Sequence, residues 1–249
     1  MLDVADVIKL QYPRTINKNG VLVTTDMYDW TPGFFPGLLW NTYEFNQDDK
    51  LQAEAIKWTQ SLEPLKNFEE HHDLGFMMYC SYGNAYRITK NDKYKKIIDT
   101  AAMSLASRFR PKIQSIQSWD SSKNFKCAVI VDNMMNLELL TWVSNNGGYP
   151  RFGEIARIHA NTTMQRQFRP DNAAFHVLDY SLATGTLLRK TTWQGYSDSS
   201  AWSRGQGWAV YGYTMMYRLT KDEKYREQAN KIAAFILNHP NYPKDGIPY

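Results

Sequence analysis

The feature that most constrains the fold is a short phrase that recurs between helix-like segments. It occurs as YRITKNDKY at residues 86–94 and YRLTKDEKY at residues 217–225, with weaker copies, YEFNQDDKL at 43–51 and WVSNNGGYP at 142–150. Apolar residues at three- and four-residue spacing precede and follow each copy, which is typical of amphipathic helices. The Asn- and Asp-rich middle supplies a turn and the N-cap of the next helix. Each unit is therefore predicted to be a helical hairpin.

The two helices of each predicted hairpin differ in composition. Those before the turn are rich in Met, Tyr, Trp and Gly, whereas those after it carry most of the Lys, Glu and Arg. This asymmetry predicts a buried inner ring and a solvent-facing outer ring of helices. The predicted fold class is all-α, an α/α barrel or toroid of stacked hairpins that forms a single domain over residues 1–249.

One long insert, residues 172–200, interrupts the helical pattern. Within it, HVLDYSLATGTLLRKTTWQGY alternates apolar and polar residues around Gly185. Alternation on both sides of a glycine turn is typical of a β-hairpin. The sequence therefore predicts a small β-hairpin inserted between helical hairpins.

Charge and hydropathy exclude several classes of protein. The net charge is only +4, with no basic run that would mark a nucleic-acid-binding stripe. No stretch approaches 18 apolar residues, so no membrane span is expected. The first residues lack the pattern of a signal peptide. Aromatic residues reach 14%, which indicates first a large core and second a surface that stacks on sugars or bases.

Counting back from the turn phrases places four chemically notable side chains. Trp30, Asp73 and Arg204 each lie thirteen residues before the first residue of a phrase, at or near the start of a predicted inner helix. Because the inner helices run parallel, these starts are expected to share one mouth of the barrel. Asp132 lies only ten residues before its phrase. It is therefore expected about one helical turn, roughly 5 Å, deeper.

Two carboxylates at one mouth are suited to acid–base chemistry on a sugar. Burial raises the pKa of a carboxyl group, so the deeper Asp132 is the better candidate for the acid and Asp73 for its partner. Each could instead be a simple N-cap, although the apolar VIV before Asp132 makes that less suitable there. Burial of an Asp side chain without a hydrogen-bond or ionic partner costs free energy, so a buried Asp is expected to have either a partner or a function.

The remaining candidates are suited to binding an acidic sugar. Arg204 can bind a carboxylate through two donors, and the flanking Trp202 and Trp208 can stack on a pyranose. The alternative for Arg204 is a buried cation–π pair. His176, on the predicted β-hairpin, either donates to a sugar hydroxyl or satisfies a core amide. His72 is expected to line the same mouth.

Other catalytic motifs are absent from the sequence. There is no phosphate-binding glycine loop, no GxSxG elbow, and no HExxH or Cys/His cluster of metal ligands. No cofactor and no metal are therefore expected.

Four motifs together resemble a known family. HHDLGF, VDNMMNLELL, FHVLDY and SAWSRGQGWAVYG, in this order, are similar to motifs of the unsaturated glucuronyl hydrolases, glycoside hydrolase family 88. The resemblance extends from about Trp30 to the end of the chain. It implies an (α/α)6 barrel, which agrees with the prediction from the hairpins.

The resemblance also implies a reaction and its residues. Family members hydrate the double bond of a terminal 4,5-unsaturated uronic acid, which releases it from oligosaccharides made by polysaccharide lyases. The family's catalytic acid/base corresponds to Asp132 and its second carboxylate to Asp73. The implied substrate-binding residues are His176, Trp202, Arg204, Trp208, His72 and Trp30.

Two points leave alternatives open. A six-hairpin barrel needs twelve helices, and the sequence supplies about nine, including one near residues 4–10. The resemblance therefore implies a barrel that is incomplete at its C-terminal side.

The rival activities are an unsaturated rhamnogalacturonyl hydrolase and a non-catalytic carbohydrate-binding toroid. The SRGQGW and DNMMNL segments favour the glucuronyl group. The oligomeric state and the preferred linkage and sulfation are not predicted.

Overall fold

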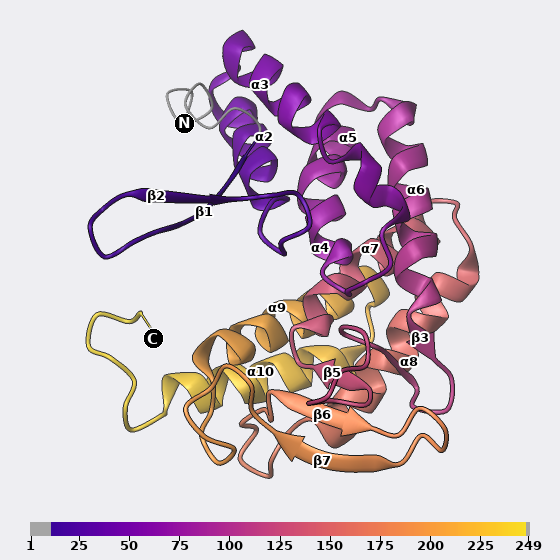
Figure 1. Cartoon of the computed structure of the whole chain (residues 1–249), viewed down its shortest axis with the longest axis vertical. Coiled ribbons are helices and arrows are strands. Elements are labelled where there is room, and N and C mark those ends of the chain that lie inside the picture. The colour runs from indigo at the N-terminus through magenta and orange to yellow at the C-terminus, as the bar shows by residue number, and fades with distance from the viewer. Residues whose placement is uncertain (1–10, 248–249) are drawn as a thin grey trace. The chain divides into compact units, whose positions relative to one another are not determined.

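The computed structural model describes residues 11–247. The chain divides into two compact units, both mainly helical (Figure 1). Unit 1 comprises Met1–Glu69 and Asp73–Ser104, and unit 2 comprises Glu70–His72 and Leu105–Tyr249. The helix expected near residues 4–10 lies outside the described residues.

Unit 1 combines a β-hairpin with two helix–turn–helix segments. Its elements are β1 (Tyr12–Ile16), β2 (Leu22–Thr25), α2 (Phe34–Asn46), α3 (Asp49–Gln60), a 3₁₀ turn (Glu63–Asn67), α4 (Leu74–Met78), a π-helical turn (Tyr79–Gly83), α5 (Asn84–Thr89) and most of α6 (Asp92–Ser107). The β1–β2 hairpin was not predicted, because its strands, YPRTI and LVTT, are too short to show clear alternation. Its base is anchored by the buried Tyr12, whose hydroxyl lies 2.6 Å from Oγ of Ser61.

The recurring phrase ends an inner helix in the same way in three of its four copies. The residue after the helix adopts left-handed backbone, with φ of 58°, 54° and 59°. Its N–H donates to the carbonyl of the tyrosine that starts the phrase, which satisfies one of the last helical acceptors. The pairs are Gln47 with Tyr43, Lys90 with Tyr86, and Lys221 with Tyr217. These three copies therefore resemble one another because each builds the same helix end.

The following helix begins as predicted in all three of these copies. Asp48, Asn91 and Asp222 accept hydrogen bonds from the N–H groups of Lys50, Lys93 and Lys224. These side chains lie at the N-termini of α3, α6 and α10, and each such cap stabilises its helix by about 1 kcal/mol.

Unit 2 contains two further helix–turn–helix segments and most of the β-structure. Its elements are β3 (Phe109–Arg110), β4 (Ser115–Ile116), β5 (Ala128–Ile130), α7 (Asn133–Asn145), α8 (Pro150–Arg166), β6 (Val177–Tyr180), β7 (Leu187–Thr191), α9 (Ser203–Thr220) and α10 (Glu223–Leu237). The helical hairpins predicted from the four phrases are thus present.

The predicted β-hairpin is confirmed as β6–β7, with Gly185 at φ +77° in its turn. Strand β5 pairs with the other edge of β6, giving an antiparallel sheet in the order β5-β6-β7. The sequence did not predict β5, because a three-residue strand has too short a pattern. Its formation matters for the site, since it leads directly to Asp132.

A close approach of two helices positions α9 beside α7. A Cβ atom at Gly212 would lie only 2.4 Å from Cβ of Met134 and 2.7 Å from its backbone. Only glycine allows this distance without displacement of one helix. The contact holds α9, which carries Arg204, against α7, which begins beside Asp132.

Within residues 11–247, no helix combines the length and the apolar character that a membrane crossing requires.

Candidate functional site

Asp132 lies at the point where strand β5 passes into helix α7. Val131 donates its N–H to the carbonyl of His176 at 3.1 Å, and Asp132 is the next residue, at the N-cap position of α7. Its φ and ψ of −55° and −27° are helical, and its side chain makes no capping hydrogen bond. The Asp132 side chain therefore does not cap the helix. It is also largely buried, since only 8% of the residue is exposed.

The extra helical turn expected before Asp132 is not present. Helix α7 ends three residues after Trp142, just as α9 ends three residues after Tyr217, so the turn phrase was aligned correctly. The difference from α9 lies at the other end, where β5 (Ala128–Ile130) occupies residues whose counterparts in α9 are helical. Asp132 thus starts its helix, as Asp73 starts α4.

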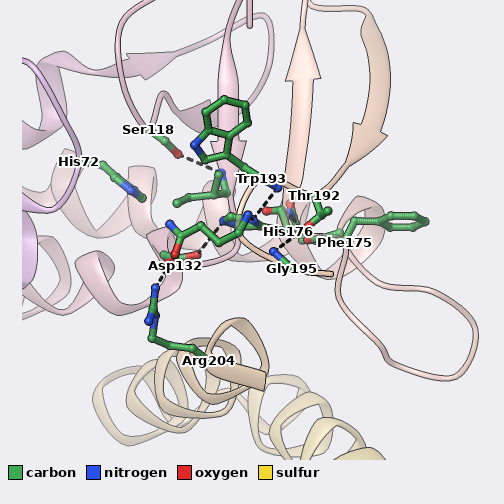
Figure 2. A network of polar contacts seen from close by, with 12 residues as sticks. His72, Ser118, Asp132, Phe175, His176, Thr192, Trp193, Gly195 and Arg204 are labelled. Carbon is green, nitrogen blue, oxygen red and sulfur yellow. Dashed lines mark hydrogen bonds and ion pairs between the residues drawn. The ribbon is translucent and has the colours of Figure 1, made fainter. Parts of the chain in front are cut away.

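His176 faces Asp132 from the start of β6. Its Nδ1 accepts hydrogen bonds from the backbone N–H groups of Trp193 at 3.0 Å and Gln194 at 3.1 Å. Its Nε2 lies 3.9 Å from Oδ1 of Asp132 (Figure 2). Burial, with smaller contributions from Arg204 and His72, lowers the pKa of His176 to about 4. A neutral imidazole with Nδ1 as acceptor carries its proton on Nε2, so the ring presents a donor to Asp132.

Arg204 is the second residue of α9 and is exposed. Its guanidinium carbon lies 4.6 Å from the centre of the Trp202 ring, and its Nη2 donates to the side-chain oxygen of Gln194. The Trp202 ring also contacts His176, with 4.3 Å between ring centres. The alternative of a buried cation–π pair is therefore wrong in one respect, because the stacking is present but the arginine is exposed.

His72 approaches the same region from the segment before α4. It is buried, and its backbone N–H donates to the carbonyl of Ser118 at 2.8 Å. Its Nδ1 lies 3.4 Å from Nδ2 of Asn136, one helical turn after Asp132. Figure 2 shows His72, His176 and Arg204 around Asp132, each from a different segment of unit 2. Trp208, half-buried, follows Arg204 by one turn of α9.

The two other predicted residues belong to unit 1. Asp73 is half-buried at the N-cap of α4 and makes no capping hydrogen bond. Trp30 is half-buried and contacts Phe34 and Phe76 edge-to-face, with the guanidinium of Arg14 5.0 Å from its ring centre. The structure thus brings together the candidates of unit 2, while the pairing of Asp73 and Trp30 with them stays a prediction.

Gln194 was missed by the sequence analysis. It contributes twice, since its backbone N–H holds His176 and its side chain holds Arg204. A single glutamine in a loop matches no motif, so only its place between the predicted β-hairpin and the SRGQGW segment could have drawn attention to it. Within the described residues, no group of three His, Cys, Asp or Glu side chains could hold a metal ion.

The arrangement combines a buried carboxyl group, a neutral imidazole donor and an arginine beside an indole ring. The carboxyl group can exchange a proton with a bound molecule. The arginine can bind an anionic group, and the indole ring can cover an apolar sugar face. The site is therefore suited to proton transfer on an acidic sugar.

Comparisons with known proteins agree with this chemistry. The sequence model of Glycosyl Hydrolase Family 88 matches residues 3–232. An unsaturated glucuronyl hydrolase of Formosa agariphila is 44% identical over 223 residues, which are 89% of this chain and 56% of that protein. An unsaturated chondroitin disaccharide hydrolase of Streptococcus agalactiae is 33% identical, over 96% of this chain and 61% of that protein. The chain thus spans less than two thirds of the length of either relative.

Solved structures show the same similarity. A crystal structure of an unsaturated glucuronyl hydrolase specific for heparin matches with a TM-score of 0.95 and 44% identity, over 99% of this chain and 67% of that one. That of an unsaturated glucuronyl hydrolase from a Bacillus species matches with a TM-score of 0.91 and 28% identity, over 98% and 66%. The predicted α/α-toroid fold class is confirmed by these matches.

Proposed function

Because the chain belongs to glycoside hydrolase family 88, we propose that it acts as an unsaturated glucuronyl hydrolase. Such an enzyme removes the terminal 4,5-unsaturated uronic acid from glycosaminoglycan-type oligosaccharides. The observation that carries the proposal is the buried carboxyl group of Asp132, whose Oδ1 lies 3.9 Å from Nε2 of the neutral His176 imidazole. The names of the relatives support the substrate class.

The proposed first step is proton transfer to carbon. The ring oxygen of the unsaturated uronate pushes electron density through C5 to C4, which makes C4 basic. The protonated carboxyl group of Asp132 forms the new C4–H bond, and the carboxylate keeps the electron pair of its O–H bond. The positive charge then rests on C5 and the ring oxygen. Negative charge nearby stabilises this cation, which is the role proposed for Asp73.

Water completes the hydration. Its oxygen bonds to C5 while one of its protons returns to the Asp132 carboxylate, so the acid is regenerated. The product is a hemiketal at C5. Its C5–ring-oxygen bond breaks as the proton of the C5 hydroxyl passes to the ring oxygen, which gives a C5 ketone and a hemiacetal at C1. The bond from C1 to the rest of the oligosaccharide then breaks as the C1 hydroxyl proton passes to the leaving oxygen, and C1 becomes an aldehyde. No covalent enzyme intermediate and no second acid are required.

The binding residues are proposed to orient the uronate for this transfer. Arg204, held by Gln194, is placed to bind the anionic sugar, and Trp202 and Trp208 to stack on it. The Nε2–H of His176 is placed to donate to a substrate oxygen or to the Asp132 carboxylate. His72 and Trp30 are proposed as further contacts. The relatives named above are bacterial, which supports a bacterial source, and a cytoplasmic or periplasmic location is proposed.

The test is an assay of the purified chain with unsaturated disaccharides. Turnover destroys the conjugated C=C–COO⁻ group, so its ultraviolet absorbance is expected to fall. A fall with glucuronyl substrates supports the proposal. A fall only with unsaturated rhamnogalacturonyl substrates would assign the rival activity instead. No fall with any unsaturated uronide, together with measurable binding, would identify a carbohydrate-binding toroid.

A further inference from the structure

The residue after Asp132 fixes the start of α7. Asn133 is fully buried, and its side-chain Nδ2 donates to the backbone carbonyl of Ile116 at 2.7 Å. Ile116 is also fully buried and belongs to β4. Any shift of the start of α7 would therefore break a buried hydrogen bond or displace β4. Such a loss leaves a desolvated polar group without compensation.

His159 holds the other side of the same peptide segment. It lies on α8, is fully buried, and accepts the N–H of Ile116 at its Nδ1 with a distance of 3.0 Å. The backbone of Ile116 is thus held at its donor by His159 and at its acceptor by Asn133. The chain of hydrogen bonds runs from α8 through β4 to α7, and it ends one residue from Asp132.

The protonation state of His159 makes it a constant acceptor. Burial, and to a smaller extent the charge of His72, lower the pKa of His159 to about 3. The ring is therefore neutral at any pH at which the protein would work. Since Nδ1 accepts, the proton resides on Nε2.

We propose that His159 is a positioning residue for Asp132, acting through Ile116 and Asn133. The inference rests on the proposed function, in which Asp132 delivers a proton to carbon and takes one back from water. Neither a motif nor the family resemblance singled out His159, and it lies on an outer helix. Misplacement of a reacting group by about 1 Å costs on the order of 100-fold in rate. The hydrogen bonds from His159 through Ile116 to Asn133 are therefore expected to affect kcat, whereas substrate binding is expected to depend on Arg204 and the tryptophans.

Two substitutions separate this role from general stability. His159→Leu removes the acceptor for the Ile116 N–H, and His159→Asn keeps an acceptor oxygen close to the position of Nδ1. We expect His159→Leu to lower kcat by roughly 10- to 100-fold with KM unchanged, and His159→Asn to retain most of kcat. If His159→Leu fails to fold, His159→Gln replaces it, because the longer side chain carries its oxygen past the Ile116 N–H.

Tyr213→Phe is the matched control. The Tyr213 hydroxyl donates to the carbonyl of Ala160 on the same helix α8, at 3.0 Å, and this bond involves neither Ile116 nor Asn133. Its loss removes one buried hydrogen bond, as His159→Leu does, and should lower stability without changing kcat. An equal fall of kcat in Tyr213→Phe and His159→Leu would show a merely structural role and overturn the proposal.

A second measurement does not depend on turnover. In a ¹⁵N-labelled chain, the side-chain amide resonance of Asn133, assigned by its loss in Asn133→Asp, reports the bond to Ile116. We expect it to move in His159→Leu and to stay in place in His159→Asn and Tyr213→Phe. An unmoved resonance in His159→Leu would overturn the positioning role. Absence of turnover in the unsubstituted chain would overturn the proposed function alone, since the resonance still decides whether His159 fixes Asn133.

Discussion

The Nε2 atom of His176 lies 3.9 Å from Oδ1 of Asp132, while Nδ1 of the same ring accepts two backbone N–H groups at 3.0 and 3.1 Å. The two donors fix the tautomer, so the proton of the neutral ring is directed to the side of Asp132. The loop that follows β7 supplies both donors through Trp193 and Gln194. The same loop therefore orients the imidazole and, through the Gln194 side chain, the guanidinium of Arg204.

Replacement of Asp132 tests the candidate acid directly. Asp132→Asn should abolish turnover and keep the fold, because an amide of the same shape has no proton to deliver. Loss of general acid–base participation costs about 100- to 10,000-fold in rate. Measurement of kcat tests whether turnover is lost, and measurement of the unfolding midpoint tests whether the fold is kept. Retention of more than about a tenth of the activity would show that another group supplies the proton.

Arg204→Lys tests the binding of the anionic sugar. The substitution keeps the charge but loses the planar pair of donors, so KM should rise while the unfolding midpoint stays the same. Arg226→Lys is the matched control, because Arg226 is an exposed arginine that pairs with Glu223 on α10. An unchanged KM in Arg204→Lys would favour a role confined to stacking on Trp202.

His176 should make stability fall in acid. Its pKa is about 6.5 in the unfolded chain and is lowered to about 4 in the fold, chiefly by burial. The unfolded state therefore binds more protons between these values. The stabilisation is complete above pH of about 6.5 and is lost as pH falls towards 4, to a limit of about 3 kcal/mol.

Urea unfolding at several pH values between 7 and 4 measures this effect. His176→Asn keeps an acceptor for the two N–H groups but does not titrate, so its free energy of unfolding should fall less steeply in acid. His239→Asn provides the control substitution, because His239 is half-buried and its Nδ1 also accepts a backbone N–H, that of Asn241. Equal slopes in His176→Asn and in the unsubstituted chain would show that His176 is not the group that takes up the proton.

Much of the helical framework could be predicted from the sequence because it depends on local chemistry. The turn phrase contains the tyrosine carbonyl, the left-handed C-cap and the Asp N-cap within a few residues of one another. Lys221 and Asp222, for example, end α9 and begin α10 side by side. The β6–β7 turn could be predicted for the same reason, since Gly185 and the alternation around it are local.

The parts that could not be predicted depend on contacts between distant segments. Strand β5 forms because Ala128 to Ile130 pair with β6, almost fifty residues later. Strand β5 ends two residues before Asp132, so Asp132 stands at the helix start rather than one turn inside. Gln194 likewise gains its role only when folding brings it to both His176 and Arg204. The candidate residue types could be identified from the sequence, but their hydrogen-bond partners could not.

The last prediction concerns Asp73 and the pH dependence of activity. Turnover requires Asp132 to be protonated, so kcat/KM should fall as pH rises through the pKa of Asp132 in the folded chain. If Asp73 shares the site, as the helix starts predict, its negative charge disfavours ionisation of Asp132 and holds that pKa up. Asp73→Asn removes the charge, so the alkaline limb of the profile should shift to lower pH, with a lower maximum rate. Asp171→Asn serves as the control and should leave the limb in place, because Asp171 is an exposed residue before β6 that accepts the N–H of Ala173. A limb that does not move in Asp73→Asn would mean that the two carboxyl groups are too far apart to couple, and the shared mouth inferred from the thirteen-residue count would be wrong.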